Sequence, residues 1–224
     1  MKRILLFIAI SLLLSVTLFA QDRSSLYFVF LNTNPEREAL SEDSVASLQK
    51  GHLANIDSLF KDGKLVAAGP FTGGGGIFIL KATSATELDS YFKRDPAIQA
   101  NRFILETLPM KILSGKLCDV LGDYTMQNFV FIRFTDFPMD IDLGKSSQEI
   151  SELHADHWRQ DNSDTRILFE AEFPEGSGGI MILESDNEIL ADEWMQEDPY
   201  LIYKKYAYEI KTIWIAAETF CKSQ

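Results

Sequence analysis

The chain has 224 residues, of which 46% are hydrophobic and 24% are charged, and its formal net charge is −12. This length is enough for two small domains or one larger one. The acidic balance argues against binding to nucleic acid or to an anionic membrane surface, because both would repel the chain. The composition is otherwise that of an ordinary globular protein, and the candidate catalytic residues below imply a small-molecule ligand.

The first twenty residues are typical of a secretory signal peptide. Lys2 and Arg3 form a short basic region, and residues 4–19 are almost entirely apolar. Ala20 then precedes a polar stretch, so we expect cleavage after Ala20. The alternative is a membrane anchor, but the apolar stretch is short for a membrane span. We therefore expect a periplasmic or secreted mature protein without a membrane segment.

The rest of the sequence nearly repeats itself. At an offset of 102 residues, which becomes 103 after a glycine-rich turn, the two copies share His52 with His154, Thr33 with Thr135, Asp95 with Asp198 and Pro96 with Pro199. A repeat of this length is a whole domain rather than a solenoid unit. We expect a signal peptide over 1–20, domains over 21–113 and 127–224, and a linker over 114–126.

The first copy reads as β-α-β-β-α-β, the ferredoxin-like order. Its expected strands cover residues 26–31, 65–68, 77–82 and 103–113. Its first helix has an apolar stripe formed by Val45, Leu48, His52, Ile56 and Leu59. Gly63 is a candidate helix C-cap, and Ser84 with Glu87 forms a capping box that starts the second helix. Asp95-Pro96 then ends that helix.

The second copy repeats this order. Its expected strands cover residues 129–134, 166–173, 179–183 and 206–215. Its helices are expected to bury Ile150, Leu153, His154, His157, Trp158, Ile189, Leu190, Trp194 and Met195. An antiparallel sheet with helices on one face must cover its other face. The fold class is therefore α+β, with two tandem ferredoxin-like βαββαβ domains whose sheets face each other as an intramolecular pseudo-dimer.

His52 and Asp95 are the candidate catalytic residues. The apolar position of His52 points its ring toward the sheet, and Pro96 keeps Asp95 out of helical backbone geometry. A histidine oriented by a carboxylate can transfer protons near neutral pH. The alternative is structural: Asp95 would cap the turn that begins at Pro96, and His52 would be a satisfied core residue. His154 and Asp198 form the second candidate pair.

Other motifs give weaker indications. His154 and His157 have an H-x-x-H spacing, but no nearby cysteine supports a metal site, and we expect none. Residues 73–76 are all glycine, but they lie in a hairpin turn rather than at a helix N-terminus, so phosphate binding is not expected. No nucleotide-binding or nucleophile-elbow motif is present, and no cofactor is expected.

The two cysteines, Cys118 and Cys221, lie 103 residues apart, each just after the last strand of its copy. In an exported protein they could form a disulfide between the copies. The alternative is a pair of free, half-buried thiols, and the sequence does not distinguish the two.

The motifs together resemble the YCII-related family of the dimeric α+β barrel superfamily. The resemblance rests on a helix histidine, the segment Gly63-Lys-Leu-Val-Ala-Ala-Gly-Pro70, a hairpin, a short helix and Asp95-Pro96. It covers most of both copies and implies a pseudo-dimeric α+β barrel with a His–Asp active site of the lyase or hydrolase type. A pocket beside His52 would include Gly69 and Pro70, which the second copy replaces with Ala171 and Glu172. A non-catalytic binding or structural module remains the alternative.

Overall fold

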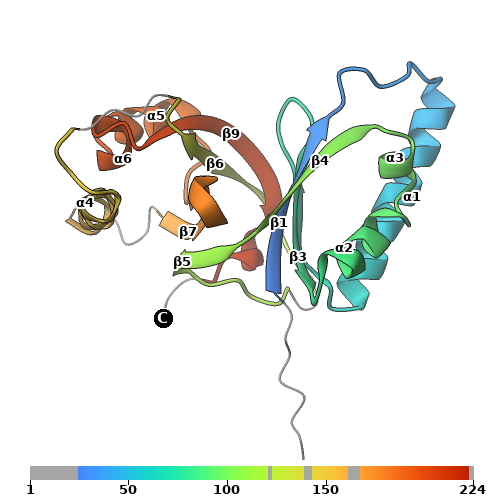
Figure 1. Ribbon diagram of the computed structural model, residues 1–224. Coiled ribbons are helices and arrows are strands. Elements are labelled where there is room, and N and C mark those ends of the chain that lie inside the picture. Colours follow the sequence, from blue (N-terminus) through green and yellow to red (C-terminus); the bar gives the residue numbers. More distant parts are fainter. Residues whose placement is uncertain (1–24, 121–122, 139–142, 161–166, 222–224) are drawn as a thin grey trace, which may run out of the picture.

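The computed structural model describes residues 25–120, 123–138, 143–160 and 167–221, so the expected signal peptide lies outside the described residues. Two antiparallel sheets face each other at the centre of the molecule, and the helices cover the two outer sides (Figure 1). Within the described ranges, no helix is long and apolar enough to cross a membrane.

The first repeat follows the expected order. Its elements are β1 (Ser25–Thr33), α1 (Glu42–Lys61), β2 (Leu65–Pro70), β3 (Gly76–Ala82), α2 (Ala85–Phe92), α3 (Pro96–Gln99), β4 (Phe103–Pro109) and β5 (Lys111–Gly115). In the described chain, four strands form a sheet in the order β2-β3-β1-β4. Gly63 follows α1 with a φ of +67°, the left-handed conformation that a helix C-terminus favours.

The second repeat has the same order with small additions. Its elements are β6 (Met126–Asp136), α4 (Ser147–Gln160), β7 (Ile167–Glu172), η1 (Pro174–Gly176), β8 (Gly179–Leu183), α5 (Glu188–Gln196), α6 (Pro199–Ile202), β9 (Tyr206–Ala216) and η2 (Ala217–Thr219). The second described sheet has five strands in the order β5-β7-β8-β6-β9.

Backbone pairing also connects the two repeats at their last strands. The expected strand over 103–113 divides into β4 and β5, and β5 pairs with β7 of the second sheet. In the opposite direction, Phe71 at the end of β2 pairs with Ile213 of β9, and the amide of Thr72 donates to the carbonyl of Thr212 over 2.9 Å. These exchanges join the two ferredoxin-like halves into a pseudo-dimeric α+β barrel, which confirms the expected fold class.

The space between the sheets is filled by aromatic and branched side chains from both repeats. Phe28 and Phe131 stack with ring centroids 6.0 Å apart, and Phe71 lies 4.9 Å from Phe131. All three residues are less than 10% exposed and belong to one apolar cluster. Burying side chains of this size is the main favourable contribution to folding. The space between these side chains is therefore a packed core.

Strand pairing changes the alignment of the two first strands. Phe28 pairs with Ile79, and Phe131 pairs with Ile182, so β1 and β6 correspond at an offset of 103 rather than 102. The expected match of Thr33 with Thr135 is therefore wrong by one residue. The spacing from Phe131 to His154 is one residue shorter than the spacing from Phe28 to His52, which restores the offset of 102 at the helix histidines.

The predicted inner face of the second helix of repeat two was also wrong at its start. Ile189 is 76% exposed and Leu190 is exposed, whereas Ala191 and Met195 are fully buried. The side chain of Asn187 accepts hydrogen bonds from the amides of Ile189 and Leu190. This cap places both residues in the first turn, so the buried face of α5 begins only at Ala191, the fourth residue after the cap.

Cys118 and Cys221 form a disulfide, with their Cα atoms 5.5 Å apart. Around it, Leu117 pairs with Phe220 as an isolated β-bridge, and the amide of Cys118 donates to the carbonyl of Thr219 over 2.9 Å. In the chain-entropy model, closing a loop of this length stabilises the fold by roughly 4–5 kcal/mol. The bond fastens the segment between the repeats to the C-terminal end of β9.

Candidate active site

Helix α1 places His52 against the sheet of the first repeat. The helix begins after Ser41, whose hydroxyl accepts a hydrogen bond from the amide of Ser44. His52 lies in the middle of the helix and is 7% exposed. Its ring stacks near Phe78 of β3 at 5.8 Å and lies 5.7 Å from the ring of Phe103 of β4. The apolar position in the sequence therefore buries most of the imidazole.

Asp95 both caps α3 and pairs with His52. One carboxylate oxygen accepts hydrogen bonds from the amides of Ala97 and Ile98 at 3.0 and 3.2 Å, as expected of an N-cap. The other oxygen lies 2.6 Å from Nδ1 of His52 and 3.4 Å from Nδ2 of Asn55. The two interpretations of Asp95 from the sequence are thus compatible, because a carboxylate has two oxygens.

A glycine in α1 allows this pairing. A Cβ atom at Gly51 would collide with the ring of Pro96, so the absence of a side chain lets α3 pack directly against α1. That contact brings Asp95 to the helix turn that carries His52. The glycine in the middle of a helix was the sequence signal for this close approach, since glycine is otherwise unfavourable there.

The carboxylate of Asp95 is held ionised although it is fully buried. Burial raises the pKa of Asp95, but the hydrogen bond and charge of His52, together with the amides of Ile98 and Ala97, outweigh this and lower the pKa below its ordinary value of 3.8. An ionised Asp95 fixes the proton of neutral His52 on Nδ1. The other ring nitrogen, Nε2, is then the acceptor.

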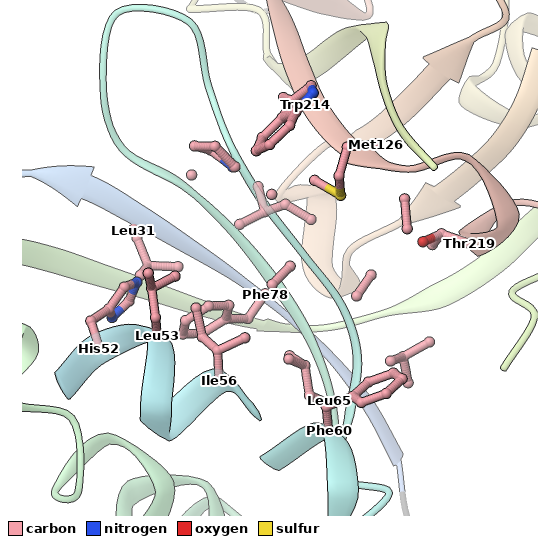
Figure 2. A pocket seen from close by; sticks show the side chains of 18 of the residues that line it. Leu31, His52, Leu53, Ile56, Phe60, Leu65, Phe78, Met126, Trp214 and Thr219 are labelled. Carbon is pink, nitrogen blue, oxygen red and sulfur yellow. The ribbon is translucent and has the colours of Figure 1, made fainter. Parts of the chain in front are cut away.

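His52 lies at one end of a pocket of about 720 Å³ (Figure 2). Among the described residues, no hydrogen bond joins Nε2 of His52 to another group. Gly69 and Pro70 line the pocket as expected. Gly69 also has a structural role, because a Cβ there would lie 2.7 Å from the carbonyl oxygen of Trp214 in β9. Its missing side chain therefore permits the contact between β2 and β9.

In the second pair, both ring nitrogens of the histidine are bound and the site is buried. Nδ1 of His154 lies 2.8 and 2.9 Å from the two carboxylate oxygens of Asp198, and Nε2 lies 3.1 Å from Oε1 of Glu170. Asp198 also accepts from the indole of Trp158 over 2.7 Å, and Tyr200 stacks on the imidazole at 3.8 Å. His154 is 1% exposed, so both ring nitrogens are occupied in a site without solvent access.

Electrostatics agree with this geometry. Burial lowers the pKa of His154, but the hydrogen bonds and charges of Asp198 and Glu170 outweigh it and raise the pKa to about 9. The imidazole is therefore a cation at neutral pH, held between two carboxylates.

Larger side chains close the second site. Strand pairing and the helix offsets make Glu170 equivalent to Ala68, Trp158 to Ile56 and Phe134 to Leu31. Ala68, Ile56 and Leu31 line the pocket of the first repeat. Glu170 was not recognised as a site residue from the sequence. Its signal was a carboxylate between the apolar residues Phe169 and Ala171 of strand β7, where a buried charge requires a partner.

The described residues offer little to a metal ion. They contain no cluster of three or more His, Cys, Asp or Glu side chains that could hold one. His157 lies against the ring of Trp158 with centroids 5.5 Å apart. The glycine run continues from Phe71 into the hairpin turn, where Gly73, Gly74 and Gly75 have positive φ angles.

Comparisons with known proteins agree with this fold. Residues 26–111 match the family model described as the YCII-related domain. The first repeat is a YCII-related domain. No curated protein matches the chain at a significant level. The match to the YCII-related domain includes α1, the hairpin and α3, and therefore both His52 and Asp95.

Solved structures extend the likeness beyond the YCII-related domain to both repeats. A candidate chlorite dismutase aligns with 88% of this chain and 96% of its own, with a TM-score of 0.54 and 11% identity. At that identity the likeness concerns the fold alone. Candidate monooxygenases from Lactobacillus acidophilus and Fusobacterium nucleatum give TM-scores of 0.48 and 0.47, with 11% and 8% identity. They cover 90% of this chain and 99% and 97% of their own, but these scores support no inference.

Proposed function

We propose that this protein is a small-molecule enzyme in which His52 is the general acid–base and Asp95 orients it. The observation that supports this most strongly is the asymmetry of the His52 ring. Nδ1 is bound to a buried carboxylate, whereas no hydrogen bond among the described residues reaches Nε2 and the residue lines a pocket of about 720 Å³. This volume is within the range of small-molecule sites, roughly 300–1,000 Å³.

The reaction class is a proton transfer within a bound substrate. Neutral His52 accepts a proton from an acidic O–H, N–H or C–H bond of the substrate at Nε2. Asp95 stabilises the imidazolium that forms, and Nε2 then returns the proton to another atom of the substrate or to a leaving group. A positioned histidine contributes typically about 10²–10⁴-fold to such a step. This chemistry fits lyase, isomerase or hydrolase reactions.

The test is a turnover screen with the mature chain, followed by two variants. His52→Ala should lower kcat/KM by about 10²–10⁴-fold. Asp95→Asn should also lower it while keeping the α3 cap, because asparagine caps helices as well as aspartate does. His157→Ala is the matched control, since His157 does not line the pocket. A variant without His52 that kept full activity would exclude this mechanism.

A non-catalytic binding module is the second candidate. The observation in its favour is the second repeat, which keeps a His–Asp pair with no free ring nitrogen. A pair of this kind can therefore serve packing alone. Saturable ligand binding that is insensitive to His52→Ala, together with failure of the turnover screen, would favour this candidate over the enzyme.

We also propose that the mature protein is exported. The basic and apolar pattern of residues 2–19 supports cleavage after Ala20, and the Cys118–Cys221 disulfide fits an oxidising compartment. The exported form should begin at or near Gln21 when its N-terminus is sequenced. An exported form that still begins with Met1 would contradict the proposal.

A further inference from the structure

The charge of the pocket wall restricts the ligand of the proposed enzyme, and this inference rests on that function. Of the described residues that line the pocket, none is lysine or arginine. Its ionisable side chains are His52, Asp57 and Tyr124. Asp57 is paired with Lys61, whose ammonium nitrogen lies 2.6 Å from its carboxylate. A carboxylate or phosphate in the pocket would therefore lack a counter-charge.

Burying an unpaired anion is costly, and the site offers little to offset that cost. His52 already faces one ionised carboxylate, Asp95, so a protonated His52 is neutralised before a ligand arrives. The net charge of −12 adds a long-range repulsion of anions. The pocket wall and the net charge of the chain thus both disfavour an anionic ligand.

The rim of the pocket is apolar. Four large side chains that solvent reaches line it together: Leu53, Phe60, Tyr124 and Trp214, which are 54%, 39%, 55% and 49% exposed. They come from different parts of the chain, namely α1, the linker and β9. Exposed apolar groups that converge on one opening indicate an apolar ligand or partner.

The second repeat supplies the wall opposite α1. Figure 2 shows Met126 and Trp214 across the pocket from Ile56, and Thr219 at the end far from His52. The amide of Cys118 bonds to the carbonyl of Thr219, and the disulfide fastens the same segment. The wall that would contact the body of a ligand is therefore built by the linker, the start of β6, β9 and η2, away from the proton-transfer end.

We propose that the pocket binds an uncharged, largely apolar molecule that presents one weakly acidic hydrogen to Nε2 of His52. The linker and β9 select its apolar body, and His52 acts on its polar end. Each YCII-like half by itself would lack one of these parts, which gives the tandem arrangement a role in specificity.

A matched pair of fluorescent dyes tests the charge preference in the full mature chain. Phenylnaphthylamine is uncharged and carries one N–H group, and anilinonaphthalene sulfonate has the same rings with an added sulfonate. The uncharged dye should bind at one saturable site, and the sulfonated dye should bind about tenfold more weakly or less. Equal or tighter binding of the sulfonated dye would overturn the proposal.

Two glutamate substitutions test the location. Trp214→Glu should weaken binding of the uncharged dye about tenfold, because it places a charge on the apolar rim. Ile189→Glu, an equally drastic change at an exposed position outside the pocket, should leave binding unchanged. Leu53→Glu repeats the test from the opposite rim if the Trp214 variant does not fold. If the uncharged dye bound both rim variants as tightly as the unaltered protein, the proposal would be overturned.

The dye results and the turnover results are independent. If the dyes behave as expected but His52→Ala leaves turnover unchanged, the acid–base function fails and the ligand class stands. If His52→Ala abolishes turnover but the sulfonated dye binds equally well, the ligand class fails and the function stands.

Discussion

The histidines of α1 and α4 occupy equivalent positions, and each meets an aspartate that caps the short helix after it. In the first repeat, Nδ1 of His52 is bound by Asp95, Nε2 has no hydrogen bond among the described residues, and the residue lines a pocket. In the second repeat, Glu170 binds the corresponding nitrogen of His154. The neighbouring strand has Ala68 in the first repeat and Glu170 in the second, so both ring nitrogens of His154 are bound and only one of His52 is.

The surrounding side chains follow the same division. Trp158 and Tyr200 pack against the second pair, where the first repeat has the smaller Ile56 and Ala97. Retention of the His–Asp pair alone therefore does not indicate catalysis in this fold. The free ring nitrogen and the space beside it distinguish the candidate active site.

The largest expected effect is the loss of stability when His154 is removed from its two carboxylates. His154→Ala should lower the free energy of unfolding by about 3–5 kcal/mol, because it leaves the carboxylate of Glu170 buried without its partner. His52→Ala should cost only about 1–2 kcal/mol, since Asp95 keeps the amides of Ala97 and Ile98. Urea unfolding of both variants measures the difference. Equal losses would remove the distinction between the two sites.

The two repeats should also lose stability at opposite ends of the pH range. The pKa of His154 is raised from 6.5 to about 9, so the stability it contributes is complete below pH 6.5 and is lost as the pH rises through 9. A shift of this size corresponds to about 3 kcal/mol. The pKa of Asp95 is lowered from 3.8, so its contribution is present above pH 3.8 and is lost as the pH falls further.

Urea unfolding across this range, with NMR titration of the imidazole protons, measures both effects. The alkaline loss should follow the titration of His154, which faces Asp198 and Glu170 and packs against Trp158 and Tyr200. A His154 resonance that titrates near its ordinary value of 6.5 would show that the second pair is not a buried ion cluster.

Much of this architecture could be predicted because the repeat and the element order are local patterns. The barrel followed from two sheets that each needed a covered face, and the first pair followed from an apolar histidine and an Asp-Pro step. The closed state of His154 could not be predicted, because Glu170 reaches it only through the pairing of β7 with β8. The exposure of Ile189 was missed for a local reason, the cap at Asn187, which shifts the buried face of α5.

Exchange of the distinguishing residue is the smallest and most specific change. Ala68→Glu should place a carboxylate beside Nε2 of His52, as Glu170 lies beside Nε2 of His154. It should lower turnover and uncharged dye binding together, by about tenfold or more, because the carboxylate occupies the pocket and adds a negative charge. The reverse change, Glu170→Ala, should cost about 1–2 kcal/mol of stability through the lost hydrogen bond and should lower the pKa of His154.

Each substitution has an outcome that would contradict the proposed difference between the two repeats. Ala68→Gln is the control for Ala68→Glu, since it adds similar volume without a charge. If Ala68→Gln lowered turnover and dye binding as much as Ala68→Glu, space rather than charge would close the site. For the second, Glu170→Gln keeps a hydrogen-bonding group beside His154 and removes only its charge. If Glu170→Ala left the pKa of His154 near 9, Asp198 alone would account for the raised value, and Glu170 would not be the residue that distinguishes the two repeats.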